Sequence, residues 1–292
     1  MTAAALVSEA AAILAAAGVP APGWDAERLV RHVLGWDRAT FLANADRVVP
    51  EPEAERVREH LRRRAAREPL QYILGTQAFW KHDFLVTPAV LIPRPETELL
   101  VETSLELVKG VDGPVIVDVG TGSGCIALSI AAEREDARVH ATDVSGPALE
   151  VARRNARRLG LEGRVAFHEG PLLEPVAELG LEAHLVVSNP PYVDRAEREE
   201  LAPEVRDHEP AEALFAPGDA LSVYRRLVPG AAALLRAGGA LVVEISPFLP
   251  ADVARLFVEA GFPEPAVRAD LAGRARVVLG RFLATPPASP VE

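Results

Sequence analysis

The sequence predicts an α/β fold: a mostly parallel seven-stranded sheet wound by helices on both faces, preceded by a small N-terminal helical domain. Three observations predict it. From about residue 97 onward, short apolar runs alternate with segments of helical periodicity. A glycine-rich turn directly follows the first of these apolar runs. Residues 1–75 show helical spacing instead.

The composition is that of a chain with two domains of ordinary size and one cysteine. About half of its 292 residues are apolar, which allows a sizeable buried core. The lone Cys125 excludes an internal disulfide and favours a reducing cytoplasm. The apolar first 18 residues contain Glu9 and no basic leader, so we expect an amphipathic helix there rather than a signal peptide. No apolar run approaches membrane-spanning length.

The net charge of −11 is unevenly distributed along the chain. Residues 1–75 carry equal numbers of basic and acidic side chains, so the whole excess of negative charge falls on residues 76–292. Phosphate affinity comes mainly from basic side chains. The acidic part therefore argues against stable binding of nucleic acid.

The first 75 residues are expected to form a helical bundle. Gly18 is placed to end the first helix, Asp25 to cap the second and Pro52 to open a later one. Six arginines between positions 56 and 67 leave two interpretations open. They form either a solvated face with i,i+4 salt bridges or a contact surface for an anionic partner such as RNA.

A linking β-hairpin is expected over residues 76–96, with a turn near Lys81–Asp83. The α/β domain then occupies residues 97–283, and residues 284–292 form a loose tail. The expected strands are Val115–Val119, Val139–Thr142, Val165–Phe167, Leu185–Ser188, Leu241–Ile245 and Arg276–Phe282, with helices near 97–109, 124–134, 146–160, 219–237 and 250–260.

A glycine loop follows the first strand of this domain. Its residues are Gly120, Thr121, Gly122, Ser123 and Gly124. Glycines let the backbone turn sharply and approach a ligand closely. A dinucleotide fingerprint would place its third glycine at position 125, where this chain has Cys125, so the spacing favours a cofactor without a pyrophosphate. S-adenosylmethionine fits, with its amino-acid end over the loop. Cys125 itself is interpreted as a small buried filler.

Two carboxylates are expected near this loop. Asp118 precedes it and can orient backbone amides or meet the ammonium group of the cofactor. Asp143 ends the next strand, where a carboxylate can accept both ribose hydroxyl protons. A helix-capping role is the alternative for Asp143, but Ser145 and Pro147 already supply a helix start. We therefore expect Asp143 to bind the cofactor.

A second motif stands at the end of the fourth predicted strand, beside the glycine loop. Its residues are Asn189, Pro190, Pro191 and Tyr192. The prolines fix the backbone and remove two amide donors, which leaves carbonyl acceptors free. The Asn189 side chain and the Pro190 carbonyl can hold both hydrogens of an incoming –NH2 group, while Tyr192 stacks on the planar group that bears it.

The chemistry of such a nitrogen explains why fixed acceptors are needed. The lone pair of an amide or aromatic amine is delocalised and weakly nucleophilic. Fixed acceptors aim the nitrogen at the sulfonium methyl and stabilise the positive charge that develops on it. The catalytic candidates are therefore Asn189, Pro190 and Tyr192. The scattered histidines predict no metal site.

These residues alone leave three functions open. An amide nitrogen and an exocyclic base amine, adenine N6 or guanine N2, suit the tetrad Asn189–Tyr192 equally well. The acidic α/β domain and the lack of an obvious target-recognition domain disfavour the nucleic acid. A non-catalytic protein that binds S-adenosylmethionine is the third possibility, and the intact tetrad disfavours it.

The chain resembles the protein-(glutamine-N5) methyltransferases of the PrmC/HemK family, which modify peptide-chain release factors. The stretches that carry the resemblance are PLQYILGTQAFW, VTPAVLIPRPETELLVE, VDVGTGSGCIALSIA, SNPPYV, EPAEALFAPGDALSVYRRL and DLAGRARVVL, over roughly residues 69–280. The resemblance implies a Rossmann-like class I methyltransferase sandwich. It also implies methyl transfer from S-adenosyl-L-methionine to the glutamine of the Gly-Gly-Gln motif in bacterial class I release factors, leaving S-adenosyl-L-homocysteine.

The resemblance assigns roles to residues of this chain. Positions 120–124, Asp143 and Asn189 would bind the cofactor, and positions 189–192 would form the glutamine pocket. Arg94, Glu96 and Glu98 would line the methionine end of the cofactor or brace it. The implied partners are release factors 1 and 2, docked on the N-terminal bundle, with no stable nucleic acid and no membrane. We expect a monomer.

The chain departs from the family pattern in three segments. Relatives often carry an acidic residue followed by an aromatic one beside adenine, where this chain has Pro171 and Leu172. We therefore expect Leu172 to hold adenine by packing and backbone contacts. Ala220 replaces the last glycine of a common GGxDGL segment, and Ser246 replaces the glycine of a common EIG segment. None of these positions belongs to the tetrad.

Overall fold

The structure is a computed structural model that describes residues 1–283, so the tail expected over residues 284–292 lies outside the described residues. The chain divides into two compact units. The first comprises Met1–Thr76 together with Leu201–His208. The second comprises Gln77–Glu200 and the chain from Glu209 onward. Residues 201–208, expected from the sequence within the α/β domain, belong to the first unit instead.

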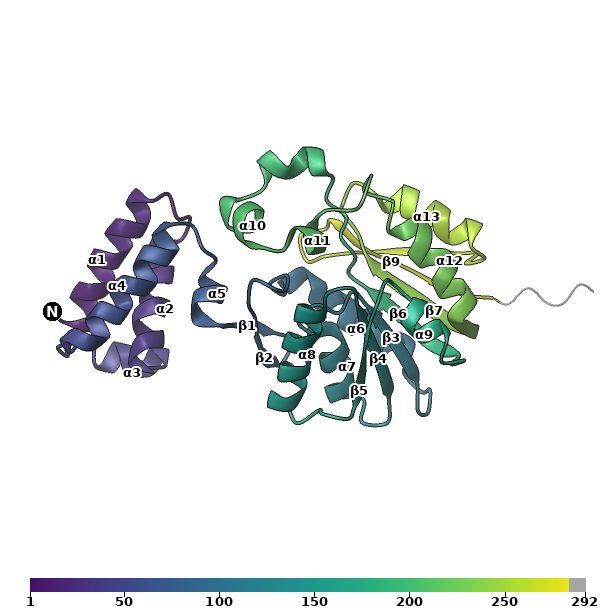
Figure 1. Cartoon of the computed structure of the whole chain (residues 1–292), viewed down its shortest axis with the longest axis horizontal. Coiled ribbons are helices and arrows are strands. Elements are labelled where there is room, and N and C mark those ends of the chain that lie inside the picture. Colours follow the sequence, from purple (N-terminus) through teal and green to yellow (C-terminus); the bar gives the residue numbers. More distant parts are fainter. Residues whose placement is uncertain (284–292) are drawn as a thin grey trace, which may run out of the picture. The chain divides into compact units, whose positions relative to one another are not determined.

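The first unit is helical, and α1, α2 and α4 lie side by side in it (Figure 1). Its buried core contains Leu6, Leu14, Leu29 and Val57. The helices are α1 Ala3–Ala16, α2 Pro22–Leu34, α3 Arg38–Ala43, α4 Glu51–Ala65, α5 Leu70–Leu74 and α10 Pro203–His208.

Asp25 does not cap α2, contrary to the sequence-based expectation. The helix begins earlier, at Pro22, and Asp25 lies buried in its first turn, where its carboxylate accepts a hydrogen bond from Arg64 Nε at 2.7 Å. Arg64 also binds Glu204 at 2.9 Å, and Arg67 binds the same carboxylate at 2.7 Å. These bonds hold residues 201–208 to the first unit. The buried guanidinium of Arg64 is thus paired on two sides, as a buried charge requires.

Other arginines of α4 pair with glutamates on the helix surface. Arg58 binds Glu55 at 2.9 Å and Arg62 binds Glu59 at 2.5 Å, both at i,i+3 spacing rather than the expected i,i+4. Exposed pairs of this kind contribute little to stability, because water and salt screen them. They fit the interpretation of a solvated, ion-paired face.

The expected hairpin consists of β1 Thr76–Phe79 and β2 His82–Leu85. Its turn includes Trp80, whose φ of 55° lies in the left-handed region, so the turn begins one residue earlier than predicted. Phe79 and Phe84 are both buried and pack edge to face with ring centroids 6.0 Å apart. They belong to the same apolar cluster as one face of the large sheet, which anchors the hairpin there.

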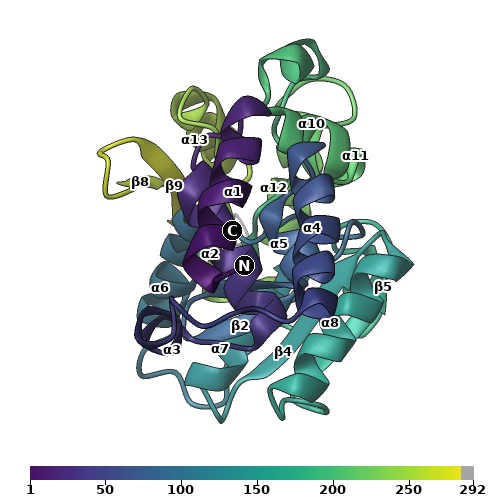
Figure 2. The ribbon, with the colours of Figure 1, turned by 90° about the vertical axis from the view of Figure 1, so that its left-hand side faces the viewer.

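The second unit is built on a seven-stranded sheet of order β5-β4-β3-β6-β7-β9-β8. The first five strands in this order are parallel, β9 is antiparallel to β7, and β8 is antiparallel to β9, which confirms the predicted mostly parallel sheet. Figure 2 shows β8 and β9, in yellow, at the edge opposite β5. The strands are β3 Val115–Val119, β4 Arg138–Asp143, β5 Val165–Glu169, β6 Ala183–Ser188, β7 Leu235–Glu244, β8 Ala266–Ala269 and β9 Ala275–Arg281.

Helices cover both faces of this sheet (Figure 1). Successive strand residues point to opposite faces, so Ile116 and Leu185 pack on one side and Val117 and Val186 on the other. The first face carries α6 Glu98–Leu107, α7 Cys125–Glu133 and α8 Gly146–Arg158, and the second carries α9 Glu174–Ala177, α12 Tyr224–Leu234 and α13 Pro250–Glu259. The helix expected over residues 219–237 was too long, because β7 already begins at Leu235.

Short elements complete the unit around its loops. They are the 3-10 helices η1 Pro95–Thr97 and η2 Arg195–Glu200 and the helix α11 Ala211–Leu214. The four-residue strand β8 was not expected from the sequence, because its residues Ala266–Ala269 are mostly exposed and form no apolar run. No helix among the described residues is both long enough and apolar enough to cross a membrane.

Gly124 is required where the glycine loop enters α7. Its φ is +82°, and a Cβ atom there would lie 2.9 Å from Leu128 Cδ1 and 3.2 Å from Ala152 Cβ. The loop therefore meets α7 and α8 at a distance that only glycine allows.

We expect Gly124→Ala to lower the free energy of unfolding by about 1–2 kcal/mol from the left-handed backbone and by about 1–3 kcal/mol more from overpacking. Gly163→Ala is the matched control, since Gly163 has a φ of +84° with nothing within 4 Å of the added Cβ. Denaturant unfolding of both variants measures the difference. Equal losses in the two variants would contradict the close-packing explanation.

Candidate active site

The site lies at the carboxyl ends of two neighbouring strands, β3 and β6. They pair in parallel with Val119 opposite Ser188, and Ser188 Oγ donates to the Val119 carbonyl oxygen at 2.8 Å. The next residues, Gly120 and Asn189, therefore leave the sheet side by side, at about the 4.8 Å spacing of paired strands. The glycine loop and the tetrad are brought together as the sequence predicted.

The glycine loop is anchored on the neighbouring strand β4. The backbone amides of Gly120 and Thr121 both donate to the Thr142 carbonyl oxygen, at 2.9 and 3.0 Å. Gly120 and Gly122 have φ values of +73° and +55°, and a Cβ atom on either would meet nothing within 4 Å. The backbone of this loop thus borders open space, into which a cofactor can approach closely.

Asp118 supplies a buried carboxylate beneath the loop. Its Oδ2 accepts hydrogen bonds from Thr121 Oγ1 at 2.6 Å and from the Ala127 amide at 3.2 Å. Its Oδ1 is buried and has no hydrogen-bond partner among residues 1–283. Burial raises the pKa of this carboxyl to about 7. An unsatisfied buried acceptor of this kind fits a site that receives a positively charged group, such as the ammonium of S-adenosylmethionine.

Asp143 lies at the tip of β4, and both of its oxygens are already used once. Oδ2 accepts from the Gly122 amide at 2.8 Å and Oδ1 accepts from the Ser145 amide at 2.9 Å. A carboxylate oxygen has a further lone pair, so each can still accept a ribose hydroxyl. Burial raises the pKa of Asp143. The contact between Asp143 and the ribose remains a prediction, and the unused lone pairs of its two oxygens allow it.

Leu172 is brought to the same strand tip. Its carbonyl oxygen accepts a hydrogen bond from Thr142 Oγ1 at 2.7 Å, and its φ is +50°, an uncommon conformation for a side chain of this size. The Gly170 amide donates to the Asp143 carbonyl oxygen at 2.9 Å. Residues 170–172 therefore form a fixed backbone segment beside Asp143, while adenine contact by Leu172 stays a prediction.

The tetrad lines a cavity of about 130 Å³. The volume is large enough for a side-chain carboxamide, and the lining residues are Leu91, Arg94, Asn189, Pro190, Pro191, Tyr192, Val193, Ala213, Leu214 and Glu244. The Asn189 amide nitrogen donates to Thr97 Oγ1 at 3.2 Å. Among the described residues, nothing donates a hydrogen bond to the Asn189 side-chain oxygen or to the Pro190 carbonyl. Both acceptors that the chemistry needs are thus available.

Glu244 links the two ends of the tetrad. Its Oε2 accepts from Thr97 Oγ1 at 2.7 Å, and its Oε1 accepts from the Tyr192 hydroxyl at 3.3 Å. Burial raises the pKa of Glu244 to about 7, and burial also raises the pKa of Tyr192. The phenol of Tyr192 is therefore a neutral hydroxyl held at its tip, which fixes the ring at the cavity wall.

Arg94 lines the cavity, while its expected companions Glu96 and Glu98 bind elsewhere. Arg94 Nη2 binds Glu209 Oε1 at 2.5 Å, and the other oxygen of Glu209 accepts from the Ile92 amide at 3.3 Å. Glu98 accepts from the Trp80 amide at 2.7 Å, and Glu96 lies 3.6 Å from Arg274. These two glutamates therefore brace the hairpin and the β8–β9 turn.

Sequence reasoning missed three residues of the site: Thr97, Glu209 and Glu244. Thr97 lies inside VTPAVLIPRPETELLVE, one of the stretches that carry the family resemblance, and Glu244 begins the segment that departs from the family pattern at Ser246. A buried carboxylate at the carboxyl end of a strand is a signal that could have identified Glu244. Nothing in the sequence indicates that Glu209 pairs with Arg94.

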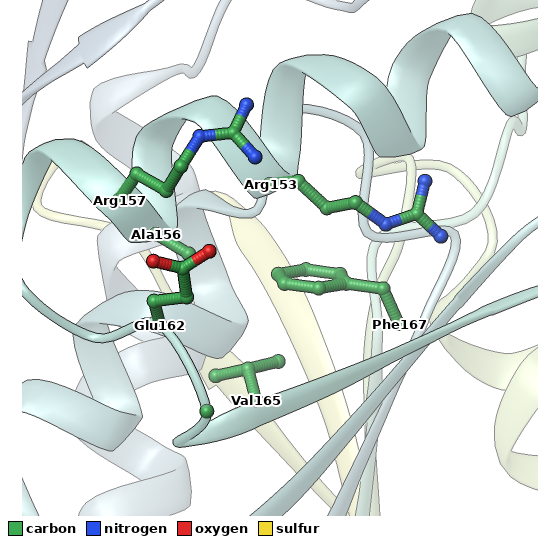
Figure 3. A pocket seen from close by; sticks show the side chains of 7 residues that line it. Arg153, Ala156, Arg157, Glu162, Val165 and Phe167 are labelled. Atoms are coloured by element: carbon green, nitrogen blue, oxygen red, sulfur yellow. The ribbon is translucent and has the colours of Figure 1, made fainter.

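A second cavity, of about 260 Å³, lies away from these residues between α8 and β5 (Figure 3). Its wall includes Arg153, whose guanidinium lies 6.0 Å from the centroid of the Phe167 ring, together with Arg157 and Glu162. It is larger than the cavity at the tetrad, but no predicted site residue lines it. Among residues 1–283 there is also no cluster of three or more histidine, cysteine, aspartate or glutamate side chains that could hold a metal ion.

Comparisons with known proteins bear on the fold and the family of the chain. The family model described as PrmC N-terminal domain matches residues 5–75, and the model described as methyltransferase small domain matches residues 95–206. The fold also resembles that of a 16S rRNA N2 methyltransferase of T. thermophilus, with a TM-score of 0.53, 20% identity and coverage of 71% of this chain and 49% of that chain. The fold, the glycine loop and the tetrad together define a class I methyltransferase.

Relatives of similar length define the family more narrowly. The release factor glutamine methyltransferase of Deinococcus radiodurans is 45% identical over 278 residues, which cover 94% of this chain and 97% of that protein. The release factor glutamine methyltransferase of Geobacter sulfurreducens is 42% identical over 269 residues, covering 92% and 93%. The chain belongs to the release factor glutamine methyltransferase family.

Asp118→Asn is expected to weaken binding of S-adenosylmethionine by about 10- to 100-fold, the worth of one charge-assisted hydrogen bond. Titration calorimetry measures the affinity, with Asp136→Asn as the control, because Asp136 binds Arg134 and the Gly113 amide outside the loop. Unchanged affinity in Asp118→Asn would contradict the assignment.

The same variant tests the raised pKa of Asp118. A folded-state pKa of about 7 against an ordinary value of 3.8 means that the cofactor-free protein loses stability as the pH rises between these values. Asparagine does not titrate, so the melting temperature of Asp118→Asn minus that of the wild type should increase with pH up to about 7. A difference that stays flat would show that Asp118 titrates normally.

Proposed function

We propose that this protein transfers a methyl group from S-adenosyl-L-methionine to the side-chain amide nitrogen N5 of the glutamine in the Gly-Gly-Gln motif of bacterial class I release factors. The observation that carries the proposal is the fixed pair of free acceptors, the Asn189 side-chain oxygen and the Pro190 carbonyl, at the wall of a carboxamide-sized cavity. Family membership supports the same substrate.

The cofactor, when bound, supplies an electrophilic methyl group on a sulfonium. The residues at the carboxyl ends of β3 and β4 suit the cofactor. The backbone of the glycine loop borders open space at Gly120 and Gly122, Asp118 Oδ1 has no partner among the described residues, and Asp143 has lone pairs left for the ribose. These residues bind and orient the cofactor beside Asn189.

The substrate amide is held by complementary hydrogen bonds. Its two N–H groups donate to Asn189 Oδ1 and to the Pro190 carbonyl, and the Tyr192 ring packs against its plane. As the nitrogen forms its bond to the methyl carbon, the bond from carbon to sulfur breaks and positive charge grows on the nitrogen. The two acceptors stabilise that charge, and the nitrogen then releases one proton to water, leaving S-adenosyl-L-homocysteine and N5-methylglutamine.

A base amine is the competing substrate. The two acceptors alone suit adenine N6 or guanine N2, and the rRNA enzyme of T. thermophilus shares the fold. Its 20% identity carries no substrate assignment, whereas the release factor enzymes share 42–45% identity over nearly the whole chain. The excess of acidic side chains also opposes stable binding to a phosphate backbone.

We expect Asn189→Ala to slow methyl transfer by about 10²–10³-fold, the usual loss for one positioned transition-state partner, with little change in cofactor affinity. Mass spectrometry of a purified release factor after incubation with enzyme and cofactor locates and quantifies the added methyl. Asn44→Ala is the control, since the side-chain amide of Asn44 donates to the Thr40 carbonyl oxygen at 2.8 Å in the first unit. A near-wild-type rate in Asn189→Ala would remove this residue from the mechanism, and methyl found only in nucleic acid would reject the substrate.

The proposal extends to the partner and the compartment. Release factors 1 and 2 both carry the Gly-Gly-Gln motif, and we propose that the enzyme modifies them in the cytoplasm as a monomer. The N-terminal helical unit is the proposed docking element, because a family-specific N-terminal model matches residues 5–75. Its paired arginines present a mixed-charge surface on α4.

Removal of residues 1–74 is expected to raise KM for a release factor at least about tenfold, since a docking contact worth about 1.4 kcal/mol is lost. The affinity for S-adenosylmethionine should stay within about twofold of the wild type, which reports that the methyltransferase unit remains folded. An unchanged KM in a truncated protein that binds the cofactor normally would end the docking proposal.

A further inference from the structure

A chain of hydrogen bonds runs from the tetrad to a buried carboxylate. The Asn189 amide nitrogen donates to Thr97 Oγ1 at 3.2 Å, and Thr97 Oγ1 donates to Glu244 Oε2 at 2.7 Å. Thr97 and Glu244 are each 2% exposed, so both are shielded from bulk solvent. The three residues come from η1, the end of β7 and the tip of β6, far apart in the sequence.

The direction of these bonds follows from the atoms that take part. An ionised carboxylate only accepts, which holds for Glu244 above its pKa of about 7, and a threonine hydroxyl has one hydrogen. The hydrogen of Thr97 therefore points to Glu244, and the Thr97 oxygen is left as an acceptor. An acceptor at this position selects the –NH2 end of the Asn189 carboxamide, so the Asn189 oxygen faces the cavity.

The opposite orientation of the same carboxamide would not support the reaction. It would place the Asn189 –NH2 against the substrate –NH2, donor against donor, and the nitrogen to be methylated would lose one of its two acceptors. The two ends of a carboxamide are alike in size, so packing alone does not choose between them. A fixed acceptor beside Asn189 does choose.

We propose that Thr97 and Glu244 are positioning residues that fix the carboxamide orientation of Asn189, so that its oxygen accepts from the substrate amide. The inference rests on one part of the proposed function, namely that the nitrogen to be methylated is an –NH2 group with two hydrogens. It assigns a role to Glu244 beyond its bond to Tyr192 and extends the tetrad by two residues from outside it.

The burial of Glu244 supports a role beyond packing. Burial raises its pKa to about 7, and hydrogen bonds from Thr97 and Tyr192 and the charge of Arg276 act in the opposite direction. In the described structure no basic group lies within ion-pair distance of Glu244. Arg276, whose charge acts on it from farther away, forms its ion pair with Asp270 at 3.2 Å. A buried carboxyl without an ion pair is costly, and an apolar side chain would fill the space more favourably.

The test compares two replacements of Thr97. Thr97→Val keeps the shape and removes the hydroxyl, and we expect kcat to fall about 10- to 100-fold with KM for S-adenosylmethionine unchanged. Thr97→Ser keeps the hydroxyl and should stay within about threefold of the wild-type kcat. Thr103→Val is the matched control, a fully buried threonine on α6 that accepts from Arg268 and lies outside the hydrogen-bond chain.

A double-mutant cycle separates positioning from a general structural effect. If Thr97 acts through Asn189, Thr97→Val should have no further effect on kcat in an Asn189→Ala background. Glu244→Gln should lower kcat to a similar degree as Thr97→Val, because a glutamine amide can donate to Thr97 and reverse the direction of the chain. It too should have no effect once Asn189 is alanine.

Additive losses in these double variants, or a wild-type kcat in Thr97→Val, would overturn the inference. Thermal unfolding and the affinity for S-adenosylmethionine report whether each variant is folded, and Glu244→Gln and Thr97→Ser carry the test if valine is not tolerated. The cycle is measured on a release factor and on any other primary amide that the wild type methylates. If the wild type methylated another primary amide but no release factor, the proposed substrate would be rejected and the positioning inference would stand.

Discussion

The parallel pairing of β3 with β6 is the constraint on which the site depends. Register places Val119 opposite Ser188, so the glycine loop and the tetrad begin at equivalent positions on adjacent strands. A shift of one residue would turn each side chain at the strand ends to the other face of the sheet. The donor of the methyl group and its acceptor are thus aligned by backbone hydrogen bonds in the core of the protein, where β3 and β6 are buried on both faces.

At these strand ends, the site presents hydrogen-bond acceptors, and the groups that could compete for them are either absent or fixed in place. The two prolines have no amide donors. The hydroxyl oxygen of Thr97 accepts a hydrogen bond from the Asn189 side-chain nitrogen, and Glu244 accepts one from the Thr97 hydroxyl. Such an arrangement needs no strong base, because the amide nitrogen loses its proton only after it has become positively charged. Asp118 follows the same principle on the cofactor side, where one oxygen holds the loop and the other has no partner.

Features that depend on neighbours in sequence were predictable, and those that depend on distant residues were not. The glycine spacing, the prolines and the apolar runs gave the sheet, its helices and the two loops of the site. Thr97 and Glu244 meet across 147 positions of sequence, so no local pattern reveals their bond. Asp25 was misjudged for the same reason: its residue type suits a helix cap, but Arg64, 39 positions later, takes its carboxylate into the core. The exposed strand β8 lacked the apolar alternation on which strand prediction relies.

The segment Leu201–His208 makes the first unit discontinuous in sequence. It is covalently continuous with the methyltransferase unit at both ends, yet Arg64 and Arg67 bind its Glu204 within the first unit. Burial raises the pKa of Glu204, but the bonds from Arg67 and Arg64 outweigh this effect and lower the pKa to about 2, so they persist at any physiological pH. The first unit is therefore assembled from two separate stretches of the chain, and high salt or strong acid that broke these ion pairs would release α10 from the other helices of that unit.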